Sequence, residues 1–188
     1  MKCYTAFAVW FIVLSVPLSY MMGTHSLSLK PSKSETLKSL IVNKNSNEKW
    51  SKLHFLGSDC ACSENVYQTL LKRIPDKNIN EQIFVIGKQD SWIKNLKAKG
   101  YQVQSGSMEE FEKKYSITAV PQLSIFDNNQ KILYSGGYTT KRGPASAVED
   151  ELIVKEIKEK KGTSERPIFG CINGSINRKN TDPLGIKY

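Results

Sequence analysis

The chain has 188 residues, enough for one domain with extensions, and a formal net charge of +9 from 27 basic and 18 acidic residues. The lysines are scattered along the sequence and belong to no recognition motif, which argues against nucleic acid as a partner. The sequence contains no phosphate loop, HExxH or Ser-His-Asp pattern, so nothing indicates a nucleotide-binding or hydrolytic site.

The N-terminal segment is uncharged after Lys2, from Cys3 to Met22. About 20 mostly apolar residues are just enough to span a bilayer as a helix. We predict a signal anchor over residues 1–22, with a cleavable signal peptide as the alternative. The anchor would make the membrane a partner and place the rest at a bacterial inner membrane, facing the periplasm or the cell exterior. A cleaved signal peptide would instead give a secreted protein.

Composition divides the rest of the chain into three regions. Residues 23–47 are rich in Ser, Lys and Asn and are predicted to be a linker. Residues 48–161 carry the apolar patterning of a folded domain. Residues 162–188 are rich in Gly, Asn and Pro, and we predict an irregular C-terminal tail that carries Cys171.

Strands and helices alternate within the predicted domain. Apolar runs predict strands over 50–56, 82–86, 101–103, 122–126 and 131–134, and helical periodicity predicts helices over 62–74, 92–99, 107–115 and 145–161. The residues Asp127-Asn128-Asn129-Gln130 indicate a β-hairpin between the last two strands. This order predicts an α/β sandwich, with a central mixed sheet flanked by helices. His54, in the first strand, is expected to be a hydrogen-bonded core residue.

The motif Cys60-Ala61-Cys62-Ser63 lies between the first predicted strand and the first predicted helix. A helix N-terminus favours a thiolate, so this position is typical of a thiol–disulfide site. Residues two apart do not share a face of a regular helix, and pairing Cys60 with Cys62 therefore requires Cys60 to precede the helix. A disulfide closing so short a loop stabilises a fold little, which favours exchange over a structural role.

Cys171, in the predicted C-terminal tail, could have one of several roles. It is a candidate thiol for resolving a mixed disulfide, or for completing a site of three thiolates with Cys60 and Cys62. Such a site would suit copper as Cu(I). It could also simply pack as a small apolar side chain. The function is accordingly predicted as thiol–disulfide exchange without a cofactor, with copper binding and a redox-inactive interaction module as alternatives.

The order of elements and two motifs resemble the thioredoxin-like superfamily over residues 48–161. The segment from Leu53 to Cys60 is similar to the family's strand leading to its nucleophilic cysteine. Val120-Pro121 is similar to the segment whose cis-proline faces that cysteine. The family spacing is Cys-x-x-Cys, whereas Cys62 comes one residue early and does not carry over residue for residue.

The N-terminal segment makes the chain resemble membrane-anchored extracytoplasmic thiol–disulfide proteins, and Cys-x-Cys-Ser resembles a motif of a RedB-like bacterial subgroup. The resemblance implies an extracytoplasmic oxidoreductase that acts on protein thiols and disulfides. We predict that Cys60 attacks the partner or carries the mixed disulfide, and that Cys62 resolves it. Val120 and Pro121 are predicted to dock the partner's backbone at a strand edge.

Overall fold

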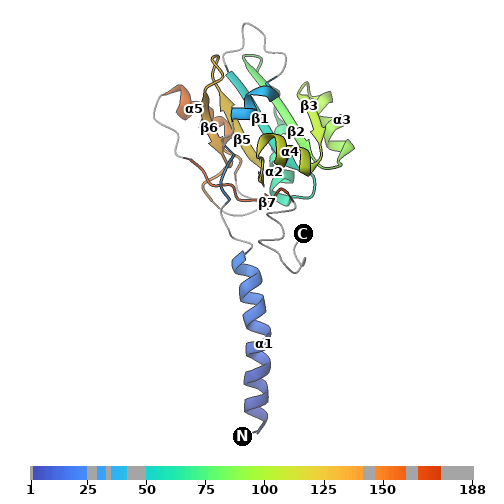
Figure 1. Cartoon of the computed structure of the whole chain (residues 1–188), viewed down its shortest axis with the longest axis vertical. Helices are drawn as coiled ribbons and strands as arrows, with labels where there is room; N and C mark the ends of the chain where they lie inside the picture. Colours follow the sequence, from blue (N-terminus) through green and yellow to red (C-terminus); the bar gives the residue numbers. More distant parts are fainter. Residues whose placement is uncertain are drawn as a thin grey trace.

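The computed structural model of the chain describes residues 2–24, 29–32, 35–41, 50–141, 147–159 and 165–174. A central five-stranded sheet organises it (Figure 1). Across the sheet the strands are β3 (Gln102–Gly106), β2 (Ile79–Ile86), β1 (Trp50–Gly57), β5 (Gln122–Phe126) and β6 (Ile132–Gly136). β1, β2 and β3 are parallel, whereas β5 and β6 form the antiparallel hairpin. The predicted mixed sheet is confirmed.

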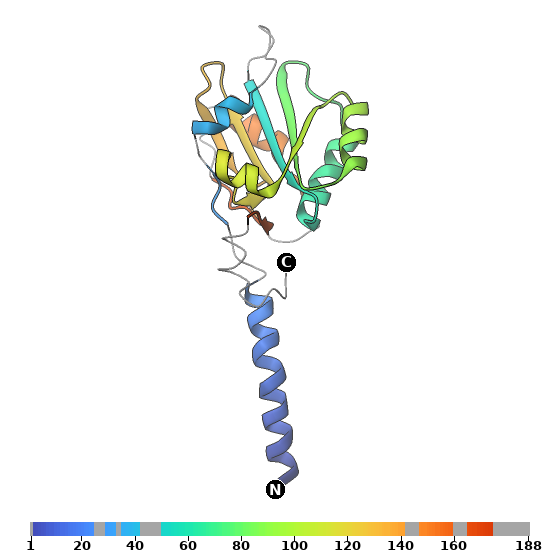
Figure 2. The ribbon, with the colours of Figure 1, turned by 45° about the vertical axis from the view of Figure 1, so that its right-hand side comes forward.

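Helices cover both faces of this sheet (Figure 2). Five short helices surround the sheet. They are the 3-10 helix η1 (Glu35–Leu40), α2 (Ala61–Lys72), α3 (Asp90–Ala98), α4 (Met108–Tyr115) and α5 (Asp150–Lys158). α5 is shorter than the helix predicted over 145–161. Residues 145–146 and 160–161 lie outside the described residues.

Alternation along β1 explains the two layers. Successive strand side chains point to opposite faces, so Phe55 joins one apolar cluster and Leu56 joins the other. The cluster around Leu56 includes side chains of α2, α3 and α5, while the cluster around Phe55 includes Leu37 of η1 and Phe111 of α4. Since both faces are covered, β1 and β2 are buried along almost their whole length.

Part of the segment predicted to be a linker packs against the domain. Leu37 is fully buried, Leu40 is 5% exposed, and both belong to the apolar cluster around Phe55. Leu29 forms an antiparallel bridge with Ile168. These described parts of residues 23–47 are therefore not a spacer, because their leucines bury apolar surface that a spacer would leave in water.

The predicted irregular tail also contains regular structure. Cys171–Ile172 forms strand β7, which pairs antiparallel with β4 (Ala119–Val120) in a separate two-stranded sheet. Sequence periodicity did not predict either strand, because two residues are too few to show an alternating pattern. The remainder of the tail, residues 175–188, lies outside the described residues.

The N-terminal helix α1 (Lys2–Thr24) stands apart from the sheet in both views (Figures 1 and 2). Within the part of the chain that the structure describes, no helix is found with the length and apolar character needed to cross a membrane. The membrane segment predicted over residues 1–22 is therefore not confirmed and stays a prediction.

Candidate functional site

Cys60 lies at the start of α2, where β1 has just ended. Its backbone is extended, with φ −122° and ψ 113°, and it is the residue before the first helical turn. The turn is fixed by Ser63, whose Oγ accepts a hydrogen bond of 3.0 Å from the backbone N–H of Gly57. Cys60 thus precedes the helix, as pairing with Cys62 requires.

The segment Val120-Pro121 faces this thiol. Its peptide bond is cis, and the Sγ atom of Cys60 lies 3.7 Å from the carbonyl oxygen of Val120. The Cys60 side chain is only 3% exposed. The structure therefore brings together three of the predicted site residues.

Cys171 joins the same site from the tail. In the pairing of β4 with β7, Cys171 lies directly opposite Val120. Its thiol forms a hydrogen bond with Cys60, and Cys62 forms another. Cys60, Cys62 and Cys171 are reduced cysteines, and the last two are half-buried. All three predicted thiols therefore meet at Cys60.

The hydrogen bonds around Cys60 lower the pKa of its thiol. The bond from Cys171 has the largest effect and the bond from Cys62 the next, whereas burial opposes them; the backbone and hydroxyl of Ser63 also lower the pKa. The pKa of Cys62 is raised by its hydrogen bond to Cys60 and by burial. Of Cys60 and Cys62, Cys60 is therefore the thiol that ionises more readily.

The strand edge predicted to receive a partner is occupied by the chain itself. β7 pairs with Val120, and Gly170 packs so closely that a Cβ atom there would lie 1.9 Å from the Val120 carbonyl oxygen. Phe169 helps to line a small pocket beside Cys62 and Pro121. A partner therefore does not reach the Val120 backbone while β7 is in place.

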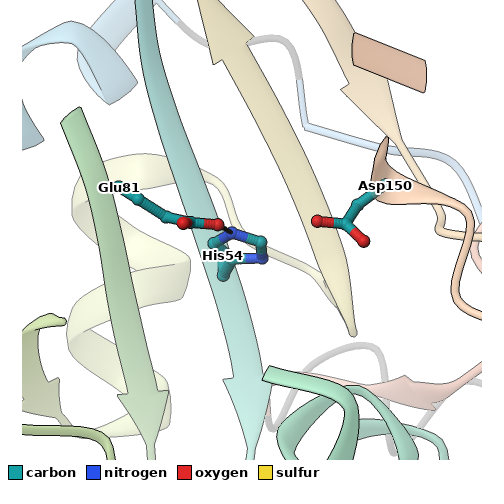
Figure 3. Close-up of side chains that lie close together, drawn as sticks. All are labelled: His54, Glu81 and Asp150. Carbon is teal, nitrogen blue, oxygen red and sulfur yellow. Dashed lines mark hydrogen bonds and ion pairs between the residues drawn. The ribbon is translucent and has the colours of Figure 1, made fainter. Parts of the chain in front are cut away.

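A buried group of charged side chains lies under the sheet face that α2 and α5 cover. His54 of β1, Glu81 of β2 and Asp150 of α5 converge there (Figure 3). Nε2 of His54 lies 2.8 Å from Oε1 of Glu81, and Nδ1 lies 2.7 Å from the hydroxyl of Tyr138. His54 is therefore a hydrogen-bonded core residue, as predicted.

Two cations complete this buried group. Nζ of Lys52 lies 3.1 Å from Asp150 and 3.3 Å from Glu81, and Arg73 pairs with both carboxylates. His54, Glu81 and Asp150 are the set of described residues whose ligand atoms are close enough to hold a metal ion, and no cysteine belongs to it. Because two cations already neutralise two carboxylates, the group is an ion-pair network and a poor cation site.

Sequence reasoning did not identify this network. Lys52 and Glu81 lie within strands that are buried along almost their whole length, and a charge in a buried strand is a signal that a partner exists. The partners themselves come from distant segments of the chain, so the sequence does not reveal them.

The pKa values of the network predict how stability depends on pH. Burial lowers the pKa of His54, against the opposing effect of Glu81. Burial would raise the pKa values of Glu81 and Asp150. The hydrogen bond from His54, together with Lys52 and Arg73, outweighs burial and lowers the pKa of Glu81, and Lys52 and Arg73 do the same for Asp150. All three groups thus bind protons more weakly in the folded chain than in the unfolded chain. Their contribution to stability is complete above the unfolded pKa and is lost as the pH falls.

We expect the free energy of unfolding to decrease as the pH falls below about 6.5, the ordinary pKa of histidine, and more steeply below about 4.5, where carboxylates protonate. Urea unfolding between pH 8 and pH 4 measures this. In the His54→Gln variant, the decrease between pH 6.5 and about pH 5 should disappear while the acidic decrease remains. An equal slope in both proteins over that range would contradict the assignment to His54.

Comparison with known proteins bears on the fold. No protein-family model matches the sequence, and no curated protein matches it. An uncharacterised conserved protein from Geobacillus kaustophilus superposes with a TM-score of 0.53 at 14% identity, over 80% of this chain and 91% of that one. A hypothetical protein from Sinorhizobium meliloti superposes with a TM-score of 0.52 at 17% identity, over 68% of this chain and 80% of that one.

A third solved structure is a secreted disulfide oxidoreductase from Mycobacterium tuberculosis. It gives a TM-score of 0.42 at 11% identity, over 61% of this chain and 84% of that one. We conclude nothing from a TM-score this low. The two superpositions with TM-scores above 0.5 support the fold alone.

The strand order β3-β2-β1-β5-β6, with a cis-proline facing a thiol at the start of α2, decides the architecture. The fold is thioredoxin-like. The predicted thioredoxin-like fold is thereby confirmed, whereas membership of the superfamily and of its RedB-like subgroup stays a prediction. In this thioredoxin-like domain the tail, through β7, adds a third thiol to the site.

Proposed function

We propose that this thioredoxin-like protein is a thiol–disulfide oxidoreductase acting on protein thiols or disulfides. The observation that carries the proposal is the position of Cys60 at the start of α2, where its thiol lies beside the cis Val120-Pro121 peptide and two other thiols. A thiolate is the attacking species in disulfide exchange. A neighbouring thiol within hydrogen-bond reach supplies the second sulfur of a disulfide.

The exchange transfers two electrons. When the partner is reduced, its disulfide breaks, a mixed disulfide forms on this protein, and a second thiolate of the site displaces the partner. The partner leaves with two thiols and this protein retains one disulfide, with Cys62 or Cys171 paired to Cys60. A thiol reductant then reduces that disulfide and restores the two thiols, so the cycle needs sulfur chemistry alone and we propose no cofactor.

Copper binding by Cys60, Cys62 and Cys171 stays a prediction. Among the described residues, the three cysteines are not a group whose ligand atoms all lie close enough together to hold a metal ion. Exchange is therefore the better-supported function.

The place of action is also a proposal. The uncharged stretch from Cys3 to Met22 supports export and tethering to a membrane, and an exported domain would meet protein thiols and disulfides outside the cytoplasm. The scattered lysines give no support for nucleic acid as a partner.

Thiol mapping tests the proposed exchange. The full chain is equilibrated across a series of glutathione redox ratios, alkylated and analysed by mass spectrometry. We expect a reversible loss of two thiols, one of which is Cys60. If the thiols at positions 60, 62 and 171 all stay free, or oxidise only irreversibly, the proposed exchange is wrong, and copper titration of the reduced chain becomes the next measurement.

A further inference from the structure

Strand β7 occupies the place that a partner strand would take beside Cys60. It pairs antiparallel with β4, so that Cys171 lies directly opposite Val120. The Sγ atom of Cys60 lies 3.7 Å from the Val120 carbonyl oxygen and forms a hydrogen bond with the thiol of Cys171. An extended peptide that exchanged with Cys60 would need this strand edge for its backbone and this position for its sulfur. The tail of the chain already fills both.

The residues before Cys171 fit the surface of the site closely. A Cβ atom on Gly170 would lie 1.9 Å from the Val120 carbonyl oxygen and 2.7 Å from Cδ of Pro121, so a larger residue does not fit unless the strand moves. Phe169 helps to line the small pocket beside Pro121. The order aromatic residue, glycine, cysteine is thus matched to the cis-proline segment of this chain.

The tail is anchored to the domain before β7 begins. Ile168 is fully buried and forms an antiparallel bridge with Leu29. The buried Arg166 pairs with Glu149 at 3.2 Å and with Glu156 at 3.0 Å. These contacts tie the tail to the domain independently of the pairing between β7 and β4.

A separate pair of hydrogen bonds holds the tail after β7. The backbone N–H of Asn173 donates to the carbonyl oxygen of Thr118 at 2.8 Å, and its side-chain Nδ2 donates to the carbonyl oxygen of Ile117 at 2.6 Å. Both acceptors lie just before β4. Releasing these two bonds would loosen β7 from β4, while the anchor before β7 keeps the tail attached to the domain.

We propose that residues 166–174 are a resident mimic of the partner, and that β7 must leave β4 before a partner strand pairs with Val120 and reaches Cys60. This inference rests on the proposed function and describes its partner. The partner is an extended segment that runs antiparallel to β4, carries its cysteine opposite Val120 and has a glycine before that cysteine. Because the mimic is tethered, it competes with the partner at a high effective concentration.

The rate at which Cys60 is alkylated tests whether β7 covers it. The full-length C62S/C171S chain keeps Cys60 as its one site thiol, and its reaction with iodoacetamide at pH 8.5 is followed by mass spectrometry. Adding Asn173→Asp replaces the donor to the Ile117 carbonyl by an acceptor of the same size. We expect β7 to open and the rate of Cys60 alkylation to increase about tenfold. A nearby negative charge disfavours a thiolate, so the new carboxylate does not itself explain an increase.

Asn80→Asp is the matched control. Asn80 is 1% exposed, as Asn173 is, but it lies opposite Ser51, at the other end of β1 from Cys60. It buries a new carboxylate without touching β7, so the rate of Cys60 alkylation should stay within about twofold of the starting value.

Gly170→Ala displaces β7 by a second route. Its methyl group would meet the Val120 carbonyl oxygen, so the rate of Cys60 alkylation should again increase. If neither Gly170→Ala nor Asn173→Asp increases this rate, or if Asn80→Asp increases it equally, the covering role given to β7 is wrong.

Competition by a peptide tests the mimicry itself. A synthetic peptide with the sequence of residues 165–174, its cysteine replaced by serine, is added to C62S/C171S/N173D at about 1 mM, the order of concentration that a short tether provides. We expect it to slow Cys60 alkylation at least about twofold. The same peptide with alanine in place of its first glycine should have no effect, because the methyl group would meet the Val120 carbonyl oxygen. Equal protection by both peptides, or by neither, would overturn the mimicry.

These measurements do not depend on catalysed exchange. Alkylation and peptide protection report only whether β7 covers Cys60 and whether the tail sequence binds there. The glutathione redox series on the unmodified chain judges the proposed function separately, because a reversible disulfide there stands whether or not the tail is a mimic.

Discussion

The Cys60→Ser variant is expected to lose catalysed thiol–disulfide exchange entirely, down to the uncatalysed background, while remaining folded. Serine is close to cysteine in size, so the buried position stays filled, but its hydroxyl forms no disulfide. Cys60 is the thiol that both neighbours contact and whose pKa is lowered. Removing it leaves neither a thiolate at the start of α2 nor the thiol with which Cys62 or Cys171 would pair. Turnover of a disulfide-containing peptide, with glutathione as reductant, measures the loss.

The matched control is Cys62→Ser, which changes the neighbouring thiol by the same single atom. If Cys171 is the pairing thiol, this control keeps exchange activity, because a serine hydroxyl at position 62 can still donate a hydrogen bond to Cys60. If Cys62 resolves the mixed disulfide, as the sequence motif predicted, the control is inactive as well. Unchanged activity in Cys60→Ser would show that the exchange chemistry lies elsewhere.

The Glu81→Gln variant should show the largest effect on stability. Glu81 is 5% exposed and pairs with Lys52, Arg73 and His54. Neutralising it leaves two buried cations facing the single carboxylate of Asp150. Removing one partner of a buried ion pair costs about 3–5 kcal/mol, because the remaining charge is left uncompensated. We expect the free energy of unfolding in urea to decrease by about this amount.

A surface pair provides the control for Glu81→Gln. Glu110 pairs with Lys114 on the exposed face of α4 at 3.1 Å, and such exposed pairs contribute little to stability because water and salt screen them. Glu110→Gln should therefore change the unfolding midpoint little. If Glu81→Gln is as mild as this control, water must compensate Lys52 and Arg73, and the network is not the source of stability inferred here.

Much of the fold follows from local patterns. The apolar run of β1 and the periodicity of α2 predicted a strand and a helix that the structure places within two residues of the expected ends. The position of Cys60 between them follows from the same reasoning, because a residue that ends a strand and begins a helix is fixed by its two neighbours. Val120-Pro121 was expected to face Cys60 by resemblance, and it does.

The partners of these residues depend on tertiary structure. Lys52, Glu81 and Asp150 stand out in the sequence at most as charges near apolar runs. Only the packing of β1, β2 and α5 brings the two carboxylates within 3.3 Å of Nζ of Lys52. The sequence therefore indicates that a buried charge needs a partner but does not identify it.

By itself, the sequence determined the alternation of strands and helices and the placement of a thiol at a helix N-terminus, since both depend on residues close together in the chain. Only the tertiary structure decided that Cys171 lies opposite Val120 and contacts Cys60. Two paired residues leave no periodic signal, and their pairing joins segments far apart in the sequence. The register of β7 on β4 is set by packing of the tail, through contacts such as that of Asn173 with Thr118.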